Sequence, residues 1–280
     1  MRQTDEIRDD FTGPLDQRWR RTLTGGGTLA LAGSALRLAL PSAVAGRYAD
    51  AQIDDYTGLR LARFPWRPPL RMELRARMSH PICPPALGPD GDHDERGQQR
   101  YLCGTVGFGF WNYPLTLGGG IPRLPDAVWF FGASPPSNMA LIPGMPGRGW
   151  KAQVVHAHRW RALLTGGPTL ASVAWARVSG REATAARWVR RLTGANEAML
   201  TLDATAWHDY TLEWRRDIAR FWIDGIETLA APDPPGGPLG FVAWIDNQYA
   251  IATPRGRLSF GALASTAEWL ELDRLLIQPL

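Results

Sequence analysis

The sequence predicts an all-β protein built as a sandwich of two antiparallel sheets. Its 280 residues include 23 prolines, 30 glycines and 13 tryptophans, a composition typical of many short strands joined by turns. Residues 36–40, 70–78 and 210–214 alternate apolar and polar side chains, the pattern of strands with one face in water. Helical periodicity is scarce, and the best candidate is a short helix within residues 180–192.

The chain is long enough to bury a full core. Because 45% of its residues are hydrophobic and sandwiches of this size commonly form one unit, we expect a single domain over residues 1–280. Stretches rich in proline and glycine are expected to form loops at the rim of the sandwich. These stretches are residues 81–99, 118–125, 135–149 and 232–238.

The charge pattern argues against two classes of partner. Lysine and arginine number 31 against 27 acidic residues, and the basic residues form only short, separated runs rather than a stripe that could follow a nucleic acid. The first ten residues carry charges of both signs and no apolar segment, which is unlike a secretory signal. No apolar run is long enough to cross a bilayer. We expect no nucleic-acid or membrane partner and a cytoplasmic location, and the sequence leaves the oligomeric state open.

Residues 105–112, T-V-G-F-G-F-W-N, form the most informative expected strand. Alternation puts Val106 and its apolar partners on one face and Gly107, Gly109 and Trp111 on the other. If the apolar set faces the core, the glycines let a ligand approach the backbone and the tryptophan offers a flat apolar surface. Alternatively, the glycines make room for a large side chain of the next strand.

Two further segments place aromatic and polar groups together. In the expected strand V-W-F-F, Trp129 and Phe131 share a face. In F-V-A-W-I-D-N-Q, Trp244 and Asp246 share a face, with Asn247 beside them. An aromatic surface next to hydrogen-bonding groups is the mixture that sugar-binding sites use.

The histidines suggest a polar lining. His156 and His158 are two residues apart on an expected strand and so share a face. That spacing can chelate a metal, but no third ligand is evident in the sequence, so we expect a polar lining without metal. His208 is expected to be a structural hydrogen-bonding residue.

A loop with Asp90, Asp92 and Asp94 begins like a calcium-binding loop. It departs from the EF-hand pattern because other residues stand where the turn glycine and the bidentate glutamate belong. We therefore expect no metal and no cofactor, with calcium at this loop as the alternative. Two cysteines, Cys83 and Cys103, cannot form a disulfide framework, and we expect free thiols.

Residues 207–214 read W-H-D-Y-T-L-E-W, and residues 220–225 read R-F-W-I-D-G. This pair resembles the paired strands near the C-terminus of laminarinase-like glycoside hydrolases of family 16 and their concanavalin A-like relatives. Residues 10–19 match the first strand of these proteins, D-F-x-x-x-L-D-x-x-W, and residues 268–277 resemble their last strand. The resemblance implies a concanavalin A-like jelly roll whose first and last strands pair and whose inner sheet forms a concave cleft. Three tryptophans of this region are assigned to the core: Trp207, Trp214 and Trp222.

The activity of the family does not carry over in the same way. Its members bear a strand E-x-D-x-x-E, whose carboxylates support a retaining mechanism at a separation of about 5 Å. The corresponding strand here, residues 105–112, contains no acid. The sequence therefore predicts non-hydrolytic binding of a carbohydrate or a similar polar, ring-shaped ligand. The residues expected to contact it are Gly107, Gly109, Trp111, Trp129, His156, His158, Trp244, Asp246 and Asn247.

Two other function classes stay open. One is an enzyme that uses relocated carboxylates, for which Asp126 and Asp246 are the candidates. The other is a structural or assembly protein whose exposed sheet pairs with another copy. The first needs two carboxylates facing each other, whereas binding needs only aromatic surfaces with hydrogen-bonding neighbours.

Overall fold

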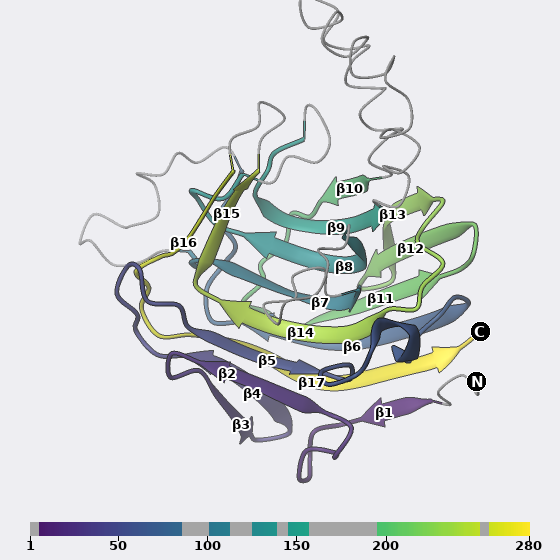
Figure 1. Ribbon diagram of the computed structural model, residues 1–280, viewed down its shortest axis with the longest axis horizontal. Coiled ribbons are helices and arrows are strands. Elements are labelled where there is room, and N and C mark those ends of the chain that lie inside the picture. Colours follow the sequence, from purple (N-terminus) through teal and green to yellow (C-terminus); the bar gives the residue numbers. More distant parts are fainter. Residues whose placement is uncertain (1–5, 86–100, 113–124, 139–144, 157–194, 253–257) are drawn as a thin grey trace, which may run out of the picture.

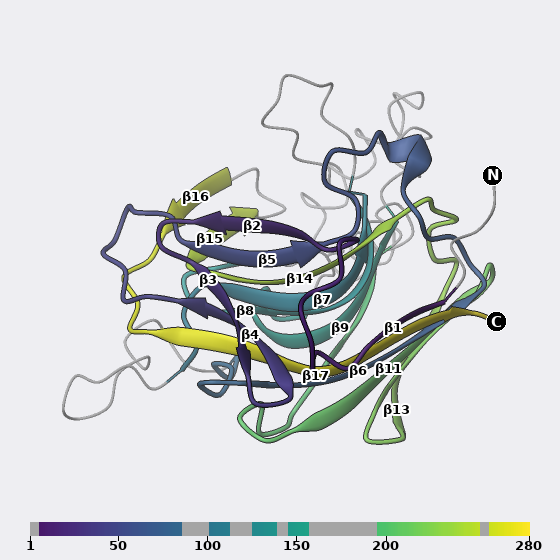
Figure 2. The same ribbon diagram turned by 90° about the horizontal axis from the view of Figure 1, so that it is seen from below.

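The computed structural model describes residues 6–85, 101–112, 125–138, 145–156, 195–252 and 258–280. Two large antiparallel sheets form a jelly-roll sandwich, as predicted (Figure 1). Turning the molecule by 90° shows β2, β5, β14 and β7 in one layer and β4, β17 and β6 in the other (Figure 2). Within the described residues, no helix is long and apolar enough to cross a membrane.

The first sheet has eight strands. Along its hydrogen-bonded path these are β13 (Ile226–Pro232), β12 (Ile218–Ile223), β11 (His208–Trp214), β6 (Leu70–Met78), β17 (Glu268–Pro279), β4 (Ala35–Leu40) and β3 (Thr28–Ala32). The remaining strand, β1 (Ile7–Asp9), pairs with β17. The first and last strands therefore lie side by side, as the resemblance implies (Figure 1). Residues 10–19, which were matched to the first strand of the family, form no strand and connect β1 to β2 (Arg20–Thr24).

The second sheet has seven strands, and a separate hairpin follows it. In order these are β10 (Asn196–Met199), β9 (Gly149–His156), β8 (Asp126–Ala133), β7 (Thr105–Trp111), β14 (Gly240–Asp246), β5 (Asp50–Asp54) and β2 (Arg20–Thr24). The hairpin consists of β15 (Gln248–Ala252) and β16 (Leu258–Ala262). A short 3-10 helix, η1 (Leu61–Arg63), lies in the connection between β5 and β6.

The main core lies between the two sheets, and alternation within each strand creates it. In β6, every second residue from Leu70 to Met78 is buried, while the arginines and the glutamate between them point outward. Aromatic rings interlock across the layers, with Phe108 of β7 4.9 Å from Tyr210 of β11. Fully burying a large apolar side chain contributes about 2 kcal/mol, so these strands are held mainly by their inward faces.

The segment that carries the family resemblance forms β11, β12 and the turn that leads into β13. Strand β11 pairs with β12, and the D-G turn joins β12 to β13 with φ of 50° at Asp224 and 80° at Gly225. Positive φ at both central residues is the geometry that two-residue hairpin turns require. His208 is structural, as predicted, because its ring contacts Asp224 Oδ2 at 2.6 Å and the carbonyl of Asp203 at 3.0 Å.

Only one of the three tryptophans assigned to the core is there. Trp214 is fully buried, but Trp222 lies on the opposite face of β12, because Phe221 and Ile223 take the core positions. Trp207 precedes β11 and lies half-buried beneath arginine side chains on the outer surface. The prediction that Trp207 and Trp222 belong to the core is wrong.

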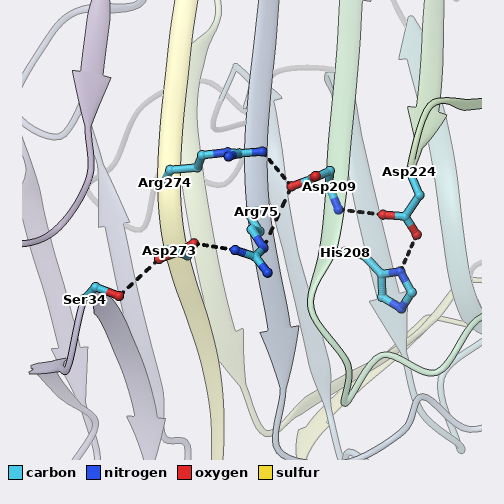
Figure 3. A network of polar contacts seen from close by, with 7 residues as sticks. All are labelled: Ser34, Arg75, His208, Asp209, Asp224, Asp273 and Arg274. Carbon is cyan, nitrogen blue, oxygen red and sulfur yellow. Dashed lines mark hydrogen bonds and ion pairs between the residues drawn. The ribbon is translucent and has the colours of Figure 1, made fainter.

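The outward face of the eight-stranded sheet carries an ionic network (Figure 3). Arg75 contacts Asp273 at 3.1 Å, and Arg274 contacts Asp209 at 2.9 Å. Asp224 joins the same network by accepting a hydrogen bond from the backbone N–H of Asp209 at 2.9 Å.

Beside this network, three arginines and two tryptophans alternate across the sheet in the order Arg37, Trp269, Arg77, Trp207, Arg75. Their guanidinium-to-ring distances lie between 4.7 and 5.4 Å. Arg37 and Arg77 both pair with Glu271, and Arg75 pairs with Asp273, so the guanidinium groups of this face have acidic partners.

Candidate functional site

The seven-stranded sheet has one face in the main core and one face turned away from it, which we call the site face. Three side chains of β7 are fully buried in the core: Val106, Phe108 and Phe110. Gly107, Gly109 and Trp111 therefore lie on the site face. This is the division of β7 that alternation predicts.

The register of the sheet brings the aromatic residues of three neighbouring strands together on the site face. Gly107 lies between Phe131 of β8 and Trp244 of β14, and Gly109 lies opposite Trp129 of β8. Directly opposite residues in antiparallel strands have Cβ atoms about 5 Å apart, so these side chains are neighbours. The predicted grouping of Trp129 with Phe131 on one face is confirmed.

The two glycines make room for the large neighbours. A Cβ atom placed on Gly107 would lie 2.5 Å from the carbonyl oxygen of Phe130 and 2.6 Å from Cη2 of Trp244. Gly109 has φ of +145°, and a Cβ atom there would lie 2.6 Å from Cα of Trp129. Of the two interpretations of these glycines, the structure shows the packing of large side chains from the adjacent strands.

Four aromatic side chains pack on this surface and form what we call the aromatic cluster: Trp111, Trp129, Phe131 and Trp244. Ring centroids of Trp111 and Trp129 are 5.7 Å apart, and those of Trp129 and Trp244 are 5.2 Å apart. Trp244 is only 8% exposed and Phe131 6%, whereas Trp111 and Trp129 are half-buried. The half-buried pair therefore provides the aromatic surface that a ligand can reach, and Trp244 supports it.

Each tryptophan of the cluster is fixed by a hydrogen bond from its indole nitrogen. These bonds run from Trp111 Nε1 to Tyr56 Oη (2.6 Å), from Trp129 Nε1 to Gln153 Oε1 (2.8 Å) and from Trp244 Nε1 to Thr105 Oγ1 (2.9 Å). A ring held both by packing and by a hydrogen bond keeps one orientation. The surface is preorganised, which lowers the entropy lost when a ligand binds.

Tyr56, the partner of Trp111, is held in place by the turn after β5. Asp54 is fully buried, and its Oδ1 accepts hydrogen bonds from the backbone N–H groups of Tyr56 (3.1 Å) and Thr57 (2.6 Å). Gln52 Nε2 donates to Asp54 Oδ2 at 3.0 Å. The acidic residue at the end of β5 thus positions one supporting side chain of the aromatic cluster.

A buried ion pair flanks the aromatic cluster on the side of β9 and β10. Lys151 Nζ donates to Glu197 Oε2 at 3.0 Å, and Gln153 Nε2 donates to the same oxygen at 3.0 Å. Lys151 also donates to the carbonyl of Pro146. Lys151 is 2% exposed, so its charge is neutralised inside the protein and is not available to an anionic ligand.

Two carboxyl groups flank the cluster on the side of β5 and β14. Asp50 and Asp246 are register partners and share the site face. Asp246 Oδ1 accepts hydrogen bonds from Thr105 Oγ1 (2.8 Å), from the backbone N–H of Thr105 (3.2 Å) and from that of Gln248 (3.0 Å). Among the described residues, no hydrogen bond reaches the carboxyl group of Asp50.

These surroundings separate the two acids in strength. Burial, together with the negative charges of Asp246 and Asp54, raises the pKa of Asp50 to about 8. Burial also raises the pKa of Asp246, but its hydrogen bonds stabilise the ionised form and limit the rise to about 6. At neutral pH, Asp50 is therefore protonated and Asp246 is mostly ionised.

Three predicted site residues lie away from the aromatic cluster. Asp126 and His156 are register partners at the ends of β8 and β9, in the alternation of the core-facing Val128 and not of Trp129. Asn247 is fully buried and bonds to the backbone of the chain, donating to the carbonyls of residues 47 and 263 and accepting from the N–H of residue 49.

Asp126 and Asp246, the candidate acids of the alternative enzyme interpretation, do not face each other. Asp126 follows the core-facing alternation of β8, whereas Asp246 lies on the site face of β14. The register also puts Asp246 opposite Thr105, at the start of β7, and Asp126 beyond its end next to Asn112. A pair on opposite faces and at opposite ends of the strands cannot act on one bond, so this assignment of carboxylates is corrected.

Several other predicted groups fall outside the described residues: His158, Asp90, Asp92, Asp94 and the helix expected within residues 180–192. In the part of the chain that is described, no three histidine, cysteine or acidic side chains gather as metal ligands. Cys83 and Cys103 are not joined by a disulfide, as predicted.

Sequence reasoning missed five polar residues of the site face: Asp50, Gln52, Lys151, Gln153 and Glu197. The alternation in D-A-Q-I-D (residues 50–54) and in K-A-Q (residues 151–153) was a usable signal, since it marks strands with one polar face. This alternation does not give the strand register, which places these polar residues beside the aromatic residues of the neighbouring strands.

No protein-family model matches the sequence, and no curated protein matches it. Solved structures are similar over nearly the whole chain. One comes from work on endo-acting O-glycanases that members of the human gut microbiota use to initiate mucin breakdown, with a TM-score of 0.52, 12% identity and 98% of each chain covered. Another is a pseudo β-1,3-glucanase and immunostimulatory antigen of Mycobacterium tuberculosis, with a TM-score of 0.50, 13% identity and 98% of each chain covered. A third is an apo transglycosylase, with a TM-score of 0.50, 9% identity, and 99% of this chain and 85% of that chain covered. At these identities, the likeness shows a shared glucanase-type fold.

Proposed function

We propose that this chain, which has the concanavalin A-like glucanase fold, binds a carbohydrate on the site face without cleaving it. The observation that carries the proposal is the pair of half-buried indoles, Trp111 and Trp129, which lie 5.7 Å apart and are each fixed by a hydrogen bond. Flat, rigid aromatic surfaces suit the apolar faces of sugar rings.

The polar neighbours of the two indoles support a sugar ligand. Gln52, which is half-buried, lies on one side of the cluster, and Asp246 lies two residues from Trp244 on the same strand. Sugar sites combine an aromatic surface with a small number of fixed hydrogen-bonding groups, which give orientation and specificity. Two of the similar structures are described as a pseudo β-1,3-glucanase and as an O-glycanase, which is consistent with this class of ligand.

The proposed absence of cleavage is supported by β7. The residues of this strand on the site face are Thr105, Gly107, Gly109 and Trp111, and none of them is a carboxylate. A retaining glycosidase needs two carboxyl groups flanking the scissile bond, one as nucleophile and one as acid. The strand that the resemblance assigns to catalysis here carries an aromatic surface instead.

Binding to a broad panel of oligosaccharides, measured by calorimetry with the products analysed for cleavage, tests the proposal. One stacked ring contributes about 1.5 kcal/mol, so Trp111→Ala and Trp129→Ala are each expected to weaken binding about tenfold. Trp222→Ala, which removes a half-buried tryptophan from the other sheet, is the matched control and is expected to bind like the parent.

Near-ultraviolet circular dichroism must show that all three variants are folded. If Trp111→Ala and Trp129→Ala bound the sugar as tightly as the parent, the proposed binding site would be refuted. Cleavage of the bound sugar would show that the protein is an enzyme.

A further inference from the structure

We propose that Asp50 and Asp246 form a polar subsite beside the aromatic cluster, which binds neighbouring hydroxyl groups of an uncharged sugar and rejects sugars that carry carboxylate or sulfate. The subsite rests on the proposed function, because it places the polar end of the same ligand. It goes beyond that function by assigning the chemical class of the sugar.

The sheet brings these two residues together from distant parts of the sequence. Asp246 of β14 lies directly opposite Asp50 of β5 in the antiparallel register, so their Cβ atoms are about 5 Å apart on one face. Each stands two residues from a site-face neighbour on its own strand, Asp246 from Trp244 and Asp50 from Gln52. The pair therefore lies one step along the strands from the aromatic cluster.

The two carboxyl groups differ in what holds them. Asp246 Oδ1 is saturated by Thr105 and Gln248, and Asp246 Oδ2 has a long contact of 3.5 Å with Tyr48 Oη. Asp50 is 4% exposed, and no described residue forms a hydrogen bond with its carboxyl group. A buried polar group without a partner is costly, and a ligand that supplies one recovers that cost.

The hydrogen-bonding capacity of the pair matches two adjacent hydroxyl groups. With Asp50 protonated and Asp246 ionised, the pair offers one donor and one acceptor side by side. One hydroxyl group of a vicinal diol accepts a hydrogen bond from the protonated carboxyl group of Asp50, and its neighbour donates a hydrogen bond to Asp246 Oδ2. Neutral sugars carry such hydroxyl pairs around the ring.

The charges around the pair account for the rejection of acidic sugars. The groups that face Asp50 are Asp246 on β14, Asp54 and Gln52 on β5, and the exposed Thr24 on β2. Tyr48 Oη contacts Asp246 Oδ2 at 3.5 Å, and the cation on this face of β2, the exposed Arg20, lies opposite Asp54, four residues along β5 from Asp50. The two charged groups that raise its pKa are both acidic. A carboxylate or sulfate at this place would meet like charges in a poorly solvated environment, and such juxtapositions are strongly unfavourable.

The subsite is also joined to the aromatic cluster. Trp244 Nε1 donates to Thr105 Oγ1, and Thr105 Oγ1 donates to Asp246 Oδ1, so one chain of hydrogen bonds links the indole to the carboxylate. A fixed relay of this kind sets the distance between the ring surface and the polar groups before the ligand arrives.

The test compares a neutral oligosaccharide that the parent binds with a uronate oligosaccharide of the same length, for the parent and for Asp50→Asn and Asp50→Ala, between pH 7 and pH 9, where Asp246 stays mostly ionised. Parent affinity for the neutral sugar is expected to fall about tenfold as Asp50 ionises. Asp50→Asn, which keeps a neutral donor, is expected to bind at pH 7 within about threefold of the parent and to lose the pH dependence. Asp50→Ala is expected to bind about tenfold more weakly at pH 7.

The controls separate failure of the subsite from failure of the proposed function. Asp217→Asn removes an exposed acid of the other sheet and is expected to keep the pH profile of the parent. If Trp111→Ala and Trp129→Ala lose binding while both Asp50 variants bind like the parent at every pH, the subsite alone is refuted. If no sugar binds, or if the uronate binds as tightly as the neutral sugar, the assignment of the ligand class is overturned.

Discussion

Gly107→Ala tests whether β7 is built around the tryptophan rings. The new Cβ atom would lie 2.5 Å from the carbonyl oxygen of Phe130 and 2.6 Å from Cη2 of Trp244, so both the adjacent strand and the ring must move. Overpacking of this kind costs about 2 kcal/mol, and loss of the Trp244 hydrogen bond to Thr105 adds about 1 kcal/mol. We expect the free energy of unfolding to fall by about 3 kcal/mol.

Urea denaturation followed by tryptophan fluorescence measures this change, and near-ultraviolet circular dichroism reports the displaced indoles. The matched control is Gly236→Ala, because a Cβ atom there meets nothing within 4 Å and its backbone is not in the left-handed region. We expect that variant to stay within about 1 kcal/mol of the parent. If the two variants were equally stable, the argument that Gly107 makes room for Trp244 would be refuted.

Two further predictions concern charged groups. The pKa of Asp50 is raised to about 8 in the folded chain, so its contribution to stability is full below the unfolded pKa near 4 and is lost as the pH rises through 8. Asp50→Asn should therefore match the parent at pH 4 and exceed it by about 5 kcal/mol at pH 9, because the parent loses about 1.4 kcal/mol for each of the roughly four pH units between the two pKa values. Equal urea midpoints at pH 9 would contradict the burial of an unpaired acid. Glu271 is 2% exposed and accepts hydrogen bonds from Arg37 and Arg77. Glu271→Gln should therefore lower the free energy of unfolding by about 2 kcal/mol, measured by thermal or urea denaturation. Glu227 belongs to an exposed ion pair, so Glu227→Gln should lower it by less than about 0.5 kcal/mol. Similar losses for both glutamates would show that burial of the Glu271 pair is not what matters.

Local patterns were sufficient for the all-β class and for the faces of single strands, whereas the concanavalin A-like jelly roll was predicted from the family resemblance. Alternation in residues 70–78 gave the buried and exposed sides of β6, and alternation in residues 105–111 gave those of β7. The D-G turn after β12 was visible because two-residue hairpin turns require residues that accept positive φ. Such signals depend on neighbours within a few residues, and a single sequence contains them.

The composition of the site face depends on contacts between strands that are far apart in the chain. Asp50 and Asp246 are 196 residues apart in sequence and become neighbours only through the pairing of β5 with β14. Nothing in either strand alone specifies its partner, because register depends on the whole sheet. The same limit explains the mistaken pairing of Asp126 with Asp246.

The misplaced tryptophans have a different cause. Trp222 was assigned to the core together with Trp207 and Trp214, although Ala219, Phe221 and Ile223 in the same segment already form an alternating apolar set. In a strand, an alternating apolar set lies on the inward face, and the residues between its members point outward. The two-residue alternation of apolar side chains along β12 therefore predicts burial better than the hydrophobicity of a single residue, because tryptophan is found on surfaces as well as in cores.

The glycines of β7 make room for the tryptophans of the neighbouring strands, and this packing limits which side chains β7 can carry on the site face. A laminarinase-like mechanism needs two carboxyl groups about 5 Å apart on such a strand. At position 107 even a methyl group meets Trp244 and the backbone of Phe130, and at position 109 it meets the backbone of Trp129. An acid at either place would have to displace the aromatic cluster and break the hydrogen bonds that fix it. Single substitutions that restore acids to β7 should therefore destabilise the protein without creating a glycosidase, because the space for catalytic carboxylates is already taken by rings.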